Sequence, residues 1–143
     1  MSALTSLLID VLWDLDLVWR LLTGRHLIGG TEYMWDPKYP LWVRLLSLFH
    51  LALPVVLFWA LRRVGYDRKA LPAQSLLALA LILASRLVGP DANVNFSWRD
   101  PFLHRALGPP ALHLAATFAG LAAWVYLPTH ALLSRIFPFG RKD

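Results

Sequence analysis

The sequence contains no cysteine among its 143 residues. This absence excludes disulfide bonds, thiolate metal sites and cysteine nucleophiles. Charged residues are scarce as well, at 16% of the chain, whereas a soluble domain usually carries about a quarter. The sequence also lacks a Gly-rich phosphate loop, an HxxH or HExxH metal motif and a distinct Ser/His/Asp arrangement. It therefore points to no nucleotide-binding, zinc-hydrolase or serine-hydrolase chemistry.

Apolar residues dominate what is present. They make up 57% of the chain, and seven Trp and seven Phe are included. The mean hydropathy is +0.51, and amphipathic aromatic side chains collect at membrane–water boundaries. The net charge of +5 could suit nucleic acid, but the basic residues flank apolar runs and form no stripe. We therefore expect residues 1–143 to form one integral membrane domain whose partners include membrane lipids and exclude nucleic acid.

Three segments are clear candidates to cross the membrane as helices: residues 41–61, 71–88 and 111–127. Each approaches the roughly 20 apolar residues that a helix needs to span the hydrocarbon layer. The first is preceded by "WDPKYP" and followed by Arg62 and Arg63. The second stops at Gly89 and Pro90, and the third lies between two prolines and Pro128. Proline before a helix and Gly-Pro after it are typical helix boundaries.

Residues 4–22 are long enough to span but hold Asp10, Asp14, Asp16 and Arg20. Each charge at mid-bilayer costs about 3 kcal/mol on insertion scales, so a helix lying on the membrane surface is the alternative. Asp10 and Asp14 share a helix face, whereas Asp16 and Arg20 lie well round it. A surface helix is also expected to be basic on its polar face. We therefore predict an all-α protein, a bundle of four transmembrane helices.

Basic residues indicate the orientation of the four predicted spans. They cluster between the second and third spans and in the tail, and such clusters mark the cytoplasmic side. Both termini are then cytoplasmic, and the Ala/Leu/Arg-rich composition predicts a multi-pass protein of a bacterial inner membrane. The residues concerned are Arg62, Arg63, Arg68, Lys69, Arg135, Arg141 and Lys142.

Ionisable groups inside hydrocarbon usually pair or line a wet cavity. With about 1.5 Å of rise per residue, His50 and Asp14 fall at a similar depth. We therefore predict an outward-facing polar pocket under the loop 93–98. Candidate acid–base residues are His50, Asp14 and His113, and candidate ligand-binding residues are Asp16, Arg20, Arg44, Arg86, Asn93, Asn95 and Trp98. The alternative is that these residues only form packing seams between helices.

His50 has three interpretations. As a haem ligand it needs a second imidazole at its own depth, but His113 is predicted near the outer surface and His130 at the inner end. As an acid or base it could work with Asp14. As a hydrogen-bonding group it would tie two helices together, and this structural interpretation is favoured. Pro54 is expected to kink the helix and to free a carbonyl near His50.

The outer loops could in principle bind a metal through His26, Glu32 and Asp36, or through Asp91 and His104. Loop residues of these types more often cap helices and complete turns. We therefore predict no metal site, and no cofactor can be assigned.

Four short segments, "GTEYMWD", "LLSLFHLALP", "GYDRKAL" and "NVNFSW", together resemble a family of small uncharacterised bacterial integral membrane proteins. The resemblance covers most of the chain and implies membrane placement. It implies no activity, cofactor or site.

Three functional hypotheses remain open. In the first, the pocket binds a lipid, a quinone or another amphiphile, or the protein binds a partner membrane protein or a second copy of itself. In the second, the chain is a membrane enzyme that acts on a lipid-like substrate through a histidine and a carboxylate. In the third it is a channel or proton-coupled carrier, which would require an oligomer because four helices form a poor pore.

Overall fold

The computed structural model describes residues 2–101 and 103–138, so Arg141 and Lys142 lie outside the described residues. The described chain is helical and contains no β-strand. Its α-helices are α1 (Ser2–Thr23), α2 (Leu41–Leu46), α3 (Phe49–Val64), α4 (Ala70–Ala84), α5 (Pro110–Leu121) and α6 (Leu127–Ile136). Short 3-10 turns are η1 (Glu32–Met34), η2 (Ser85–Leu87) and η3 (Val94–Phe96), and the π-helical turn η4 (Ala122–Tyr126) joins α5 to α6.

Three helical stretches in the described chain, not four, are long and apolar enough to cross a membrane. They are Leu41–Val64, Ala70–Leu87 and Pro110–Ile136, which correspond to the three clear predictions from the sequence. Helix α1 has the length, with 22 residues, but its three aspartates and Arg20 make it too polar. The prediction of four transmembrane helices is therefore supported for three of them.

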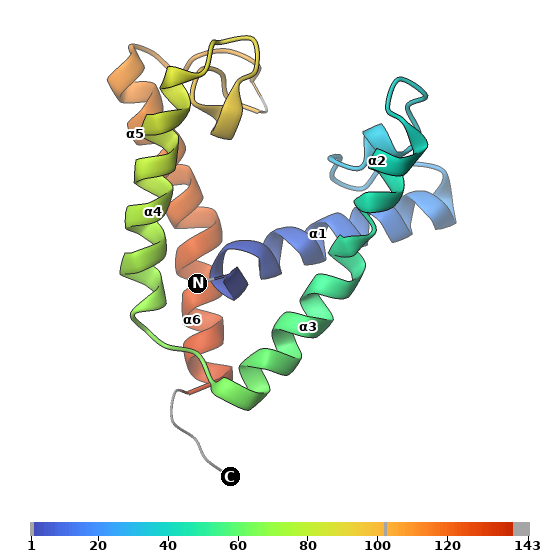
Figure 1. The fold of residues 1–143 in the computed structure, drawn as a ribbon, viewed down its shortest axis with the longest axis vertical. Coiled ribbons are helices and arrows are strands. Elements are labelled where there is room, and N and C mark those ends of the chain that lie inside the picture. The colour runs from blue at the N-terminus through green and yellow to red at the C-terminus, as the bar shows by residue number, and fades with distance from the viewer. Residues whose placement is uncertain (1, 102, 139–143) are drawn as a thin grey trace.

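The helices form two arms joined by a crossing helix (Figure 1). One arm is α4 packed beside the continuous column of α5, η4 and α6. The other is α2 followed by α3, which diverges from the first arm toward the end where α2 lies. Helix α1 runs obliquely between the arms and packs most extensively against α3. The two polar loops, 24–40 and 88–109, lie at the same end of the molecule.

The buried core lies where α1 begins. Leu4 and Tyr126 are almost fully buried there, together with Leu133. The same cluster includes Leu61 near the end of α3 and Tyr66 in the turn that follows it. The N-terminal end of α1 therefore packs against α4, η4 and α6 (Figure 1).

Most large apolar side chains outside this core are exposed. The apolar window of the Leu41–Val64 stretch buries none of its residues inside the protein, and Trp42, Val55 and Trp59 are among the most exposed. In water, a surface of this kind would be strongly unfavourable, because the cost grows with the exposed apolar area. Contact with lipid removes that cost, so the exposure agrees with a multi-pass membrane protein.

Two helix boundaries differ from the sequence prediction. The last helix continues through Pro128 to Ile136, because Pro128 lies in the first turn of α6, directly after the π turn. A π turn and a proline disturb the same part of the hydrogen-bond ladder, so the helix continues past both. The break in the second predicted span lies at Ser47 and Leu48, between α2 and α3, whereas α3 continues through Pro54.

Candidate functional site

His50 forms a hydrogen bond with a buried carboxylate on a different helix. Its Nδ1 lies 2.7 Å from Oδ1 of Asp10, and Asp10 is only 2% exposed. The sequence suggested Asp14 as the partner on the basis of equal depth in two upright helices. Helix α1 instead crosses α3 obliquely, so the carboxylate one turn earlier on the same face meets the imidazole.

Two aromatic rings hold the imidazole in place. The ring of Phe49 lies 4.1 Å from that of His50, and the ring of Trp13 lies 4.8 Å away, both tilted. Because Nδ1 bonds Asp10, the free ring nitrogen is Nε2, which has no hydrogen-bond partner in the described part of the chain. A carboxylate that orients one imidazole nitrogen and leaves the other open is the arrangement used for proton transfer and for ligand binding.

Asp14 adds a second carboxylate to this group. It follows Asp10 by one turn of α1, so both carboxylates lie on the same helix face. Oδ2 of Asp10 and Oδ1 of Asp14 are both buried and accept no hydrogen bond from any described residue. Unsatisfied buried acceptors are rare in folded proteins. We call Asp10, Trp13, Asp14, Phe49 and His50 the α1–α3 cluster.

Asp16, a predicted ligand-binding residue, is fully buried and anchors the loop 24–40. Its Oδ1 accepts the backbone N–H groups of Leu27, Ile28 and Gly29 at 2.7, 2.8 and 3.0 Å. Its Oδ2 accepts hydrogen bonds from the hydroxyl of Thr31 and from Nδ1 of His26. Both oxygens therefore already have partners within the chain.

Arg20 and Arg44 contact the same loop. The guanidinium of Arg20 lies 5.4 Å from the centre of the Trp35 ring, which is a cation–π distance. Nη1 of Arg44 donates to the carbonyl of Met34 at 3.1 Å. Both arginines therefore lie with Asp16 at the end of the molecule that carries the loop 24–40, and neither forms an ion pair in the described chain.

Arg86 belongs to a separate group on the other arm, with three residues of the loop 88–109. Its guanidinium lies 4.1 Å from the Trp98 ring centre, and the Trp98 indole donates to the carbonyl of Val88. The Asn95 amide donates to the hydroxyl of Ser85 at 2.7 Å. The Asn93 carbonyl oxygen accepts the backbone N–H groups of Trp98 and Arg99.

His113 is fully buried below this loop. Its Nδ1 accepts the backbone N–H of Leu107 at 3.2 Å, and its Nε2 lies 3.0 Å from the carbonyl of Phe96. These partners require a neutral ring with the proton on Nε2. Both nitrogens are occupied, so His113 holds the loop in place and has no free nitrogen for acid–base chemistry.

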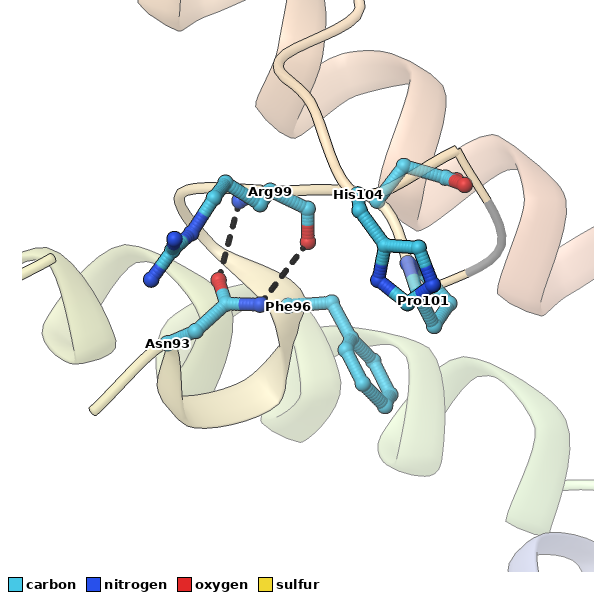
Figure 2. A pocket seen from close by; sticks show the side chains of 6 residues that line it. Asn93, Phe96, Arg99, Pro101 and His104 are labelled. Carbon is cyan, nitrogen blue, oxygen red and sulfur yellow. Dashed lines mark hydrogen bonds between the residues drawn. The ribbon is translucent and has the colours of Figure 1, made fainter. Parts of the chain in front are cut away.

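A surface pocket of about 300 Å³ opens within the loop 88–109. Figure 2 shows the rings of Phe96 and His104 on one side of it, and the hydrogen bonds between Asn93 and Arg99 on the other. Asn93 lines this pocket and also closes the loop, because its amide oxygen accepts two backbone N–H groups and its amide nitrogen donates to the carbonyl of Arg99.

At the opposite end of the molecule, the hydroxyl of Tyr66 lies 2.9 Å from Nδ1 of His130. Burial raises the pKa of the Tyr66 hydroxyl above its ordinary value, and the negative charge of Asp67 raises it further. Tyr66 therefore stays neutral at physiological pH and joins the turn before α4 to α6. A shallow pocket of about 290 Å³ lies beside it.

The structure thus distributes the predicted pocket over three places. His50 and Asp14 lie in the α1–α3 cluster; Asp16, Arg20 and Arg44 lie with the loop 24–40; and Arg86, His113 and the Asn93–Trp98 segment lie on the other arm. Asp10, Trp13 and Phe49 were missing from the predicted site. The spacing of Asp10 and Asp14 at i and i+4 was the signal that could have drawn attention to Asp10.

His50, His113 and His130 lie in separate parts of the described chain. His50 and His113 lie on different arms, and His130 bonds Tyr66 at the far end. No group of three or more His, Asp or Glu side chains among the described residues converges closely enough to hold a metal ion.

Comparisons with family models, curated proteins and solved structures find no match to the chain.

Proposed function

We propose that the protein is a bacterial inner-membrane protein that binds an amphiphile at the α1–α3 cluster. The observation that carries the proposal is the Asp10–His50 hydrogen bond, beside which Nε2 of His50 and two carboxylate oxygens have no partner among the described residues. Small-molecule sites characteristically combine an apolar lining with a few such polar groups.

The surroundings of the cluster favour a ligand with an apolar body. Val11 and Leu15, which follow Asp10 and Asp14 in α1, are exposed large hydrophobic residues, as are Leu46 at the end of α2 and Phe49 of the cluster itself. In a membrane these side chains face lipid, so a molecule that reaches His50 arrives through the acyl-chain region. The tail would lie against this surface while the head group meets His50 and the carboxylates.

The placement includes α1 as a fourth, oblique crossing with both termini cytoplasmic. Its support is the burial of Leu4 in one cluster with Leu133 and Phe137 near the end of α6. The opposite end of α1 carries the loop 24–40 through Asp16. The charges of α1 that would oppose insertion are partly compensated by His50 and by this loop.

The test is native mass spectrometry of protein purified in mild detergent. We expect a defined amphiphile to remain bound to the parent protein and to be lost from a His50→Gln variant, which removes the imidazole from the cluster. His104→Gln, an exposed histidine in the loop 88–109, is the matched control and should retain the amphiphile. Equal retention by both variants would contradict binding at this cluster.

A second function, an enzyme acting on a lipid-like substrate, is favoured by one feature. Asp10 orients Nδ1 of His50, so Nε2 could accept or donate a proton during a reaction. The same preparations distinguish the two: chemical conversion of the bound amphiphile by the parent and not by His50→Gln would indicate an enzyme, and binding without conversion would indicate a binding protein.

A further inference from the structure

We infer that the amphiphile recognised by the α1–α3 cluster is cationic, with an ammonium head group that the Asp10 and Asp14 carboxylates bind. The inference rests on the proposed function and names its ligand class. It follows from the carboxylate oxygens of the cluster that have no hydrogen-bond donor, from the number of its charges and from its aromatic rings.

Two carboxylate oxygens of the cluster are acceptors without a donor. Oδ2 of Asp10 and Oδ1 of Asp14 are buried without a donor among the described residues, and burying an acceptor without a partner costs about 1–3 kcal/mol, or more for a charged group. An ammonium group supplies three N–H donors and no acceptor. A quinone or a fully ionised phosphate would bring only further acceptors to these oxygens.

The charge of the cluster gives the same answer. His50 can compensate one carboxylate when it is protonated, but the cluster contains two. Asp10 forms its ion pair with His50, and Asp16 forms one with His26. Arg20 and Arg44 are directed to Trp35 and to the carbonyl of Met34. A positively charged ligand would supply the counter-charge for the Asp14 carboxylate, which has no ion pair of its own among the described residues.

The aromatic rings distinguish an organic cation from a metal ion. Trp13 and Phe49 flank His50, and aromatic faces attract alkylammonium groups through cation–π interactions. A divalent metal would need several converging ligands, and no such group of His, Asp and Glu is present among the described residues. The exposed apolar residues around the cluster suit the alkyl tail of a cationic amphiphile.

The experiment measures binding of tritiated dodecylammonium to the full chain in phosphatidylcholine nanodiscs. Unlabelled dodecylammonium, dodecanol and dodecanoate serve as competitors with the same tail and a positive, neutral or negative head. We expect saturable binding that only dodecylammonium displaces. Asp14→Asn should weaken it by about tenfold or more, because one charge-assisted contact is lost.

Asp14→Asn is the principal variant because Oδ1 of Asp14 has no hydrogen bond to lose, so folding is expected to be retained. Asp10→Asn is the second variant, and Asp91→Asn, an exposed carboxylate on the other arm, is the control. Displacement by dodecanol or dodecanoate, or unchanged affinity in both cluster variants, would overturn the cationic ligand and leave amphiphile binding in place. Absence of saturable binding of the labelled probe, together with a parent protein that carries no amphiphile from the membrane, would overturn both proposals.

Discussion

Asp10 and Asp16 lie on the same helix and are both buried, but they differ in how many of their carboxylate oxygens accept hydrogen bonds. Asp16 accepts three successive backbone N–H groups on one oxygen and the groups of Thr31 and His26 on the other. Successive N–H groups pointing at one anion form the kind of concave site that proteins use for phosphate. Here the chain fills that site with its own carboxylate, so Asp16 is structural, whereas Asp10 retains a free oxygen.

Replacing Asp16 by Asn should therefore destabilise the protein. The amide oxygen can still accept hydrogen bonds, but the negative charge is lost. The amide NH₂ group replaces the second carboxylate oxygen and then faces donors of the loop, with which it cannot form the same hydrogen bonds. We expect a loss of about 2–4 kcal/mol, because each lost charge-assisted hydrogen bond is worth about 1.5–3 kcal/mol. Denaturant unfolding in detergent micelles, followed by Trp fluorescence, measures the change.

The matched control for Asp16→Asn is Asp36→Asn. Asp36 is an aspartate of the loop that Asp16 anchors; it is half-buried, and its Oδ1 accepts a local turn bond from the backbone N–H of Lys38. Its replacement should change the free energy of unfolding by less than about 1 kcal/mol. Similar stabilities for the two variants would mean that Asp16 is not the anchor of the loop.

At the scale of elements, the loop 88–109 is held by side chains at several points. Four of its non-glycine residues have positive φ angles: Asn93, Asn95, Phe96 and His104. Such conformations each cost about 1–3 kcal/mol and persist where the surroundings impose them. His113 and Ser85 from the helices below supply those constraints, through the carbonyl of Phe96 and the amide of Asn95.

Removing the imidazole in His113→Ala should release this loop while the helices remain folded. The N–H of Leu107 and the carbonyl of Phe96 would lose their partners. We expect amide hydrogen exchange in residues 94–107 to accelerate by about tenfold or more, because local opening becomes less costly. Exchange in α4 should change little. His104→Ala, an exposed histidine in the same loop, is the control, and equal acceleration in both variants would contradict the role of His113.

The sequence predicted the apolar helices well because hydropathy and length are local properties. It placed the three spans close to their observed positions and the Gly-Pro stop after α4 correctly. It missed the continuation through Pro128, since the π turn that accommodates it is not encoded by a simple pattern. Depth along upright helices brought His50 and Asp14 to one level, but the oblique crossing of α1 selects Asp10, and such an angle depends on contacts between segments far apart in the chain.

The separation of the predicted pocket into three groups has the same origin. Depth along the predicted spans placed Arg20, Arg44 and Arg86 toward the two polar loops, and all three contact residues of those loops. What the sequence could not show is that α2 and α3 diverge from α4 and α5 (Figure 1). Each arginine instead contacts a nearby loop residue. Arg20 lies over the Trp35 ring, Arg44 donates to the carbonyl of Met34, and Arg86 lies over the Trp98 ring.

At the scale of the whole molecule, the polar loops and the basic turn lie at opposite ends. The turn between α3 and α4 contains Arg68 and Lys69, and Arg62 and Arg63 lie in the last turn of α3. Their guanidinium groups fold back over Phe58 and Trp59, so charge and aromatic surface coincide at this end. Cationic and aromatic side chains together are typical of a cytoplasmic membrane interface.

Because the chain has no cysteine of its own, single cysteines can test this orientation without background. We expect a membrane-impermeant maleimide to label Asp91→Cys in intact cells and Arg68→Cys only after the membrane is opened, since α4 and η2 separate the two positions. Labelling of both in intact cells would contradict the crossing by α4. Ser2→Cys tests α1 in the same assay. Leu4 belongs to the buried cluster that extends to Leu133 and Phe137 near the end of α6, so a cysteine at position 2 should also require an opened membrane, and labelling in intact cells would show that α1 does not cross.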